Sequence, residues 1–121
     1  MKHDASSEEA QAKTLRGPTD EEIVLLQYLL DLASIELNAK DFMIVSMADG
    51  GMGSVSIGTP DPHRSFGRVA AECCFNDSDG TLVFVCLNLD QYGAPFEMDV
   101  WKVAFSPLVT WPARDQLRVK E

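Results

Sequence analysis

The stretch Thr81-Leu82-Val83-Phe84-Val85-Cys86-Leu87-Asn88-Leu89 carries apolar residues at both its odd and its even positions. Successive side chains of a β-strand point to opposite faces of the sheet, so both faces of this stretch are apolar. A strand of this kind is typical of the middle of a sheet, where neighbouring layers cover both sides. We therefore expect residues 81–89 to form the central strand of the fold.

Alternating apolar and polar residues predict half-buried strands on either side of this stretch. From Val69 to Phe75 the odd positions are apolar, and from Phe96 to Val100 the even positions are apolar. Earlier in the chain, two short apolar runs flank the glycine-rich turn at residues 49–53, which predicts a hairpin because glycine readily adopts a positive φ. The strands that we expect beside the central one are residues 42–47, 54–57, 66–75 and 96–101.

A helix is expected before these strands. Thr19 and Glu22 have the spacing of a capping box, in which each side chain bonds the backbone N–H of the other residue. From Ile23 onward, apolar residues recur at three- and four-residue steps, as in a helix with one buried face. We expect this helix to run for about four or five turns and to end near Asn38.

The fold class that follows is α+β, with an N-terminal helix packed on an antiparallel meander sheet of about five strands. Residues 1–17 have no apolar periodicity, and we expect them to form a flexible N-terminal arm. Residues 18–112 are expected to form the single α+β domain. We expect residues 113–121 to be a charged C-terminal tail.

Acidic residues outnumber basic ones by nineteen to ten, which gives a formal net charge of −9. The excess lies in residues 18–112, where fourteen acidic and four basic residues give −10. This charge repels nucleic-acid phosphates and anionic lipid headgroups, so we expect no nucleic-acid and no membrane binding. The chain also has no apolar run long enough to predict a transmembrane helix. The acidity fits a solvated surface, or a surface that meets a basic partner.

The three cysteines, Cys73, Cys74 and Cys86, lack the spacing of a metal site or a disulfide framework. We expect them to be small buried side chains in a reducing cytoplasm, with a redox role as the alternative. The turn at residues 77–80 is similar to part of a calcium loop, but Phe75 and Cys86 would fall at ligand positions and cannot bind calcium. We therefore expect no metal and no cofactor.

Seven residues are our candidates for contact with a partner: Asp77, Asp79, Asp90, Tyr92, Glu97, Asp99 and Trp101. Glu97, Asp99 and Trp101 alternate along one predicted strand and so share its face opposite the core. Carboxylates beside an aromatic anchor have the composition of a binding hot spot. A simple solvated face and acid–base catalysis are the alternatives for these residues.

The turns at residues 49–54 and 77–80, the run Leu87-Asn88-Leu89-Asp90 and the strand at residues 96–102 together resemble a small bacterial family of uncharacterised stand-alone domains. The opening Pro18-Thr19-Asp20-Glu21-Glu22 is similar as well. The resemblance spans roughly residues 16–108 and implies a bacterial origin but no mechanism. Small acidic domains of this kind are often immunity proteins in polymorphic toxin systems, which is an analogy.

We therefore expect a non-enzymatic acidic binding protein that neutralises a basic protein partner such as a bacterial toxin. The alternative is a small-ligand-binding or enzymatic domain with a pocket between helix and sheet near Asp49, His63 and Asp90. A carboxylate of raised pKa in such a cavity would favour that alternative. A third option is homo-oligomerisation through an edge strand.

Overall fold

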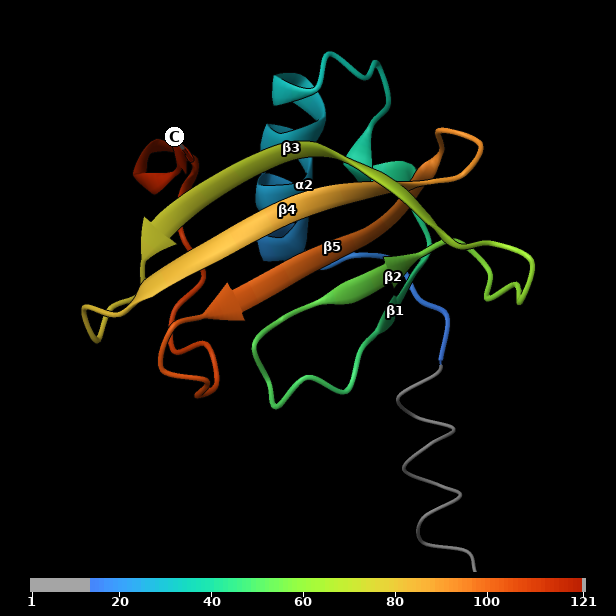
Figure 1. Ribbon diagram of the computed structural model, residues 1–121. Coiled ribbons are helices and arrows are strands. Elements are labelled where there is room, and N and C mark those ends of the chain that lie inside the picture. Colours follow the sequence, from blue (N-terminus) through green and yellow to red (C-terminus); the bar gives the residue numbers. More distant parts are fainter. Residues whose placement is uncertain (1–13, 121) are drawn as a thin grey trace, which may run out of the picture.

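The computed structural model describes residues 14–120 as one helix packed on one antiparallel sheet (Figure 1). The helical elements are α2 (Asp20–Leu32), η1 (Ala39–Asp41) and η2 (Arg114–Gln116). The strands are β1 (Ile44–Ser46), β2 (Val55–Ile57), β3 (Phe66–Asn76), β4 (Leu82–Asp90), β5 (Pro95–Lys102) and β6 (Arg118–Val119). The predicted α+β class is confirmed. No helix in the described part of the chain is long and apolar enough to cross a membrane.

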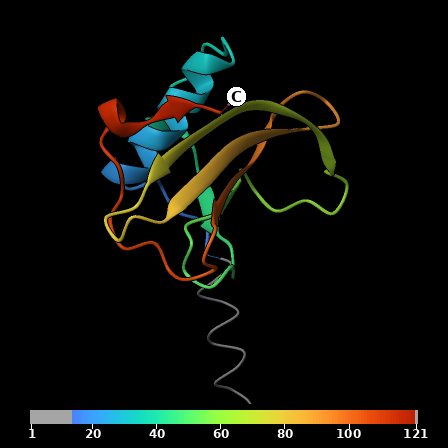
Figure 2. The same cartoon turned by 60° about the vertical axis from the view of Figure 1, so that its left-hand side comes forward.

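The sheet has six strands rather than five, in the order β1-β2-β5-β4-β3-β6. Strands β3, β4 and β5 form the predicted meander, in which each strand pairs with the next. The β1–β2 hairpin lies outside this order, because β2 pairs with the free edge of β5 and not with β3. Figure 2 shows that α2 covers one side of this curved sheet and that, among residues 14–120, no second α-helix covers the other side. The two sides of the sheet therefore have different surroundings.

The strand β4 lies in the middle of the sheet, as its two apolar faces predict. Its odd-numbered apolar residues face α2 and are at most 2% exposed. The leucines of α2 that meet them are completely buried: Leu25, Leu26, Leu29 and Leu30. Each such leucine contributes about 2 kcal/mol through removal of apolar surface from water. The space between helix and sheet is thus filled by side chains of the core.

The start of α2 is as predicted, but its end is not. Thr19 and Glu22 form the expected capping box. The helix then ends at Leu32, well before Asn38, because Ser34 adopts a left-handed φ of 57°. This turn lets the N–H of Ile35 donate back to the carbonyl of residue 30 at 2.9 Å. Such a closing bond is typical of a Schellman motif, which satisfies the last carbonyls of a helix.

The residues at both ends of the described chain also differ from the predicted arm and tail. Residues 1–13 of the predicted arm lie outside the described residues, but Arg16 forms an antiparallel bridge with Ile44. Residues 113–120 do not form a separate tail, because β6 pairs with β3 and Leu117 is buried in the core. Arg114 also binds Asp31 of α2 at 3.0 Å. The residues that follow position 112 therefore pack against the sheet and α2.

Candidate functional site

The sheet face opposite α2, here called the open face, carries cross-strand rows of side chains from β3, β4 and β5. One row consists of Glu72, Cys86 and Asp99, which are direct neighbours in the two strand registers. The next row consists of Cys74, Phe84 and Trp101. Asn88 and Glu97 are paired on the other side of the first row. The open face therefore has an acidic row beside an aromatic one.

The aromatic residues of the open face contact one another. The rings of Phe84 and Trp101 stack with centroids 5.6 Å apart, and Phe105 lies 5.9 Å from Trp101 in a tilted arrangement. Trp101 is 44% exposed and Phe105 is 70% exposed. Phe105 has a φ of 56°, a left-handed conformation that costs energy for a bulky residue. The chain thus holds an aromatic side chain out to solvent at a cost in backbone strain.

The carboxylates of Glu97 and Asp99 lie on the same face of β5 with one neutral donor between them. The side-chain amide of Asn88 donates to Asp99 at 3.0 Å and more weakly to Glu97 at 3.5 Å. Burial, followed by the charge of Asp99, raises the pKa of Glu97 above its ordinary value. The raised pKa indicates a negative charge that its surroundings do not compensate.

The three carboxylates that the fold buries most deeply each have a basic partner instead. These pairs are Glu22 with Arg16, Asp90 with Arg64 and Asp77 with Lys102, at N–O distances of 2.8, 2.9 and 2.8 Å. Neither Glu97 nor Asp99 forms an ion pair within residues 14–120. Burying negative charge without a cation is unfavourable, and Glu97 and Asp99 are half-buried carboxylates that lack one.

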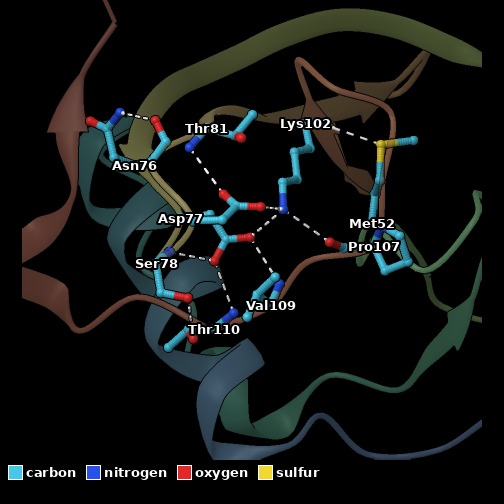
Figure 3. Close-up of polar contacts among 11 residues, drawn as sticks. Met52, Asn76, Asp77, Ser78, Thr81, Lys102, Pro107, Val109 and Thr110 are labelled. Carbon is cyan, nitrogen blue, oxygen red and sulfur yellow. Dashed lines mark hydrogen bonds and ion pairs between the residues drawn. The ribbon is translucent and has the colours of Figure 1, made fainter.

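Asp77 and Asp79 do not belong to the open face, and Asp77 is not available to a partner. The ammonium of Lys102 is buried and binds Asp77 at 2.8 Å, Asp79 at 2.7 Å and the carbonyl of Pro107 at 3.1 Å (Figure 3). Asp77 is only 4% exposed and also accepts the backbone N–H groups of Val109 and residue 110. These contacts tie the β3–β4 turn to the segment after β5. The docking role predicted for Asp77 is therefore wrong, and Asp79 is partly engaged by the same lysine.

Asp90 is the last residue of β4 and Tyr92 lies in the turn that follows it, at the end of the sheet away from the β3–β4 turn (Figure 1). Asp90 is only 4% exposed, because Arg64 binds it at 2.9 Å and two N–H groups of the turn donate to it. These bonds hold the pKa of Asp90 below its usual range, and the bond from the backbone N–H of Ala94 contributes most. Tyr92 is 79% exposed. Asp90 is thus a structural residue, and of the seven candidates only Glu97, Asp99 and Trp101 lie together on the open face.

The pocket predicted between helix and sheet is not formed as the sequence indicated. Core side chains fill that space, and Asp49 lies in the β1–β2 loop, where it accepts the N–H groups of Met52 and Ser54 at 3.1 and 2.9 Å. His63 lies between β2 and β3, and Figure 1 shows the β2–β3 loop at a different end of the sheet from the β1–β2 loop. The lowered pKa of Asp90 is the opposite of what a buried general acid needs.

Two of the three cysteines, Cys73 and Cys86, have thiols of raised pKa. Burial, with neighbouring charges, raises the pKa of Cys73 to about 12 and that of Cys86 to about 11. Both thiols are therefore protonated at neutral pH, which makes them poor nucleophiles. Within residues 14–120, no cluster of three His, Cys, Asp or Glu side chains is arranged to hold a metal ion.

Sequence reasoning missed several residues of the open face: Glu72, Phe84, Asn88 and Phe105. Phe84 had a usable signal, because a large aromatic residue at an even position of β4 indicated that this face is apolar as well. Glu72 had none, since its alignment with Asp99 depends on two strand registers. Phe105 follows the last predicted strand, and its contact with Trp101 depends on its unusual backbone conformation.

Comparison with known proteins adds a family. No curated protein and no solved structure matches the chain. The model of the family described as Domain of unknown function (DUF6984) matches residues 15–112, which include α2 and strands β1 to β5. The chain therefore belongs to this family of uncharacterised domains.

Proposed function

We propose that this protein is a non-enzymatic binding protein whose open face takes a basic protein partner. The observation that carries this proposal is the absence of an ion-pair partner for Glu97 and Asp99 within residues 14–120, while each of the most deeply buried carboxylates has one. A basic side chain of a partner would supply the missing cation. Trp101, half-exposed beside them, would supply the aromatic anchor that interfaces commonly use.

The overall charge supports the same conclusion. Residues 18–112 carry a formal charge of −10, so the field of the domain attracts basic proteins over distances up to about a Debye length, roughly 8–10 Å. Long-range attraction raises the rate of encounter, and the local carboxylates fix the orientation of the complex. The protein would then associate quickly at low salt and more slowly at high salt.

Within this proposal, the partner class that we favour is a basic toxin, such as a nuclease, which the protein would inhibit as an immunity protein. A nuclease must attract phosphates and therefore carries a basic active surface, which an acidic domain can cover. Occupying such a surface blocks substrate access without any chemistry by the inhibitor. The experiment below does not assume this class of partner.

The proposal can be tested by affinity capture from lysate of the source cells at low and at high salt. Three baits are compared: the wild type, the double variant Glu97→Gln/Asp99→Asn, and the control Glu36→Gln/Asp41→Asn. The control residues are exposed and precede the sheet in the sequence. Both double variants remove two negative charges, so they differ only in where the charge is lost. We expect a basic protein that the wild type and the control retain at low salt, and that the test variant loses.

Association rates measured with the captured protein then distinguish the effect of the open-face carboxylates from the effect of the net charge. We expect the test variant to lower the on-rate by about tenfold and the control to lower it by no more than about twofold. If the test variant captures the same basic protein as strongly as the wild type does, the open face is not the binding surface. If the wild type captures no basic protein at low salt, the proposed function is wrong.

A further inference from the structure

A groove of about 390 Å³ runs along the open face between the acidic and the aromatic row. Its lining includes Glu72, Phe84, Cys86, Asp99 and Trp101. We propose that this groove receives an arginine side chain of the basic partner. This inference rests on the proposed function and adds the chemical identity of the group that is recognised.

The β3–β4 and β4–β5 registers place one carboxylate on each side of Cys86. Glu72 and Asp99 flank Cys86, one strand away on each side, so their backbones are two strand spacings or about 10 Å apart. The thiol at this point senses both charges: its pKa is raised by burial first, then by Asp99, Glu72 and Glu97. Negative potential therefore converges above Cys86. A cation placed there is attracted most strongly by Asp99, because Lys120 already lies 3.6 Å from a carboxylate oxygen of Glu72.

The aromatic row provides the second half of the site. Phe84 precedes Cys86 by two residues in β4, and Trp101 follows Asp99 by two residues in β5, so both rings stand next to the acidic row on the same face. The methylene groups of a long basic side chain can pack on these rings while its charged end reaches the carboxylates. The carboxylates alone would attract any cation, and the rings restrict the choice to a side chain with an apolar stem.

The protein already holds one cation in this groove. The ammonium of Lys120 lies 5.6 Å from the centroid of the Phe84 ring and 3.6 Å from a carboxylate oxygen of Glu72. This intramolecular contact shows that the Phe84 side of the groove accepts a basic side chain. The equivalent positions beside Asp99 and Trp101 have no cation within residues 14–120. The partner's side chain would take these positions.

A guanidinium suits these positions better than an ammonium does. It is planar, stacks on aromatic rings, and can donate two parallel hydrogen bonds to one carboxylate. Its weaker hydration also lowers the cost of entering a groove with an apolar lining. Phe105, which is held against Trp101 in a left-handed conformation, lengthens the aromatic wall on which such a group can stack. These properties predict a preference for arginine over lysine at equal charge.

The test uses the full-length ¹⁵N-labelled protein and three synthetic peptides of equal length and charge. Their basic residues are arginine, lysine or dimethylarginine, which keeps its charge but loses hydrogen-bond donors. Binding at low salt is followed by the indole N–H of Trp101 and the backbone amides of Cys86 and Asp99. The indole of Trp111, which packs against Gly53, is the internal reference.

We expect the arginine peptide to shift the Trp101 indole and to bind at least about threefold more tightly than either other peptide. The variant Asp99→Asn should abolish this preference, and the control Asp41→Asn should keep it. The spectra of each variant show directly whether it is folded. Should Asp99→Asn lose its fold, Trp101→Leu provides a second variant, read on the Cys86 amide.

The outcomes separate this inference from the proposed function. Equal affinity for the arginine and lysine peptides overturns arginine recognition but leaves a basic partner on the open face in place. Shifts that occur elsewhere, or no shifts with any peptide, overturn the inference as well. In that case the capture experiment with Glu97→Gln/Asp99→Asn decides independently whether the proposed function also fails.

Discussion

The ammonium of Lys102 lies 2.8 Å from a carboxylate oxygen of Asp77, although the two residues are 25 positions apart in the chain. Both side chains are at most 1% exposed. The same ammonium also donates to Asp79 and to the carbonyl of Pro107. One lysine therefore joins the end of β5, the β3–β4 turn and the segment that follows β5. Buried ion pairs need all their hydrogen bonds to offset the loss of hydration. Here every donor of the ammonium has an acceptor.

Replacing Asp77 by alanine should therefore destabilise the protein strongly. The change leaves the partly exposed Asp79 as the only carboxylate partner of Lys102, and it frees the backbone N–H groups of residues 78, 109 and 110. We expect the free energy of unfolding to fall by about 3 kcal/mol. Urea unfolding measures it, and Asp79→Asn should cost clearly less. Equal losses for the two variants would show that Asp77 is not the main partner of Lys102.

The lowered pKa of Asp77 predicts how the stability of the protein depends on pH. Although burial acts in the opposite direction, the bond from Lys102 and the three backbone N–H donors lower the pKa of Asp77 to about 2. An acid whose pKa is lower in the folded state adds stability above its unfolded pKa of about 3.9, and this stability is lost as the pH falls toward 2. Stability measured between pH 5 and pH 2 should thus fall more steeply for the wild type than for Asp77→Asn. Parallel curves would contradict the assignment.

The sequence was sufficient for the parts of the fold that depend on local patterns. The capping box of Thr19 and Glu22, the hairpin around Gly50 and the central position of β4 follow from spacing and periodicity alone. The pairing of Lys102 with Asp77 could not be predicted, because it depends on how β5 lies against the β3–β4 turn. For the same reason Leu117 was assigned to a charged tail: one apolar residue among charged neighbours gives no periodic signal.

The candidate site was predictable to the same degree. Alternation along β5 placed Glu97, Asp99 and Trp101 on one face, and the structure confirms that placement. It could not indicate that Asp90 is neutralised by Arg64, which lies 26 positions away and binds it through the folded β2–β3 loop. An acidic residue near a turn can be a surface charge or a structural hydrogen-bond acceptor. Only the three-dimensional contacts distinguish the two.

Gly67 is expected to tolerate no side chain. A Cβ atom at this position would lie 2.2 Å from the backbone carbonyl oxygen of Asp90, where β3 and β4 approach at a register shift. Backbone cannot move aside as a flexible side chain can, so Gly67→Ala should separate the strands and lower stability by about 2 kcal/mol. Thermal unfolding tests this, with Gly17→Ala as the control, because a Cβ there meets no atom within 4 Å. A neutral Gly67→Ala variant would contradict the close approach.

Glu97→Gln should change stability and binding in opposite directions. Because burial and Asp99 raise the pKa of Glu97, its charged form is disfavoured in the folded state, and wild-type stability should decrease as the pH rises above about 4.3, the ordinary value of a glutamate. Glutamine removes this charge, and at pH 7 we expect a gain of about 0.5 kcal/mol, since solvent screens a half-buried carboxylate.

The same substitution should weaken capture of the basic partner, because one of the two unpaired carboxylates is lost. Replacing a residue that supports the fold would lower stability, whereas replacing a residue that serves binding commonly raises stability and weakens binding. Urea unfolding at pH 4 and pH 7 measures the first effect, and the on-rate of the captured partner measures the second. If Glu97→Gln lowers both stability and binding, Glu97 supports the sheet itself and acts on the partner only through the fold.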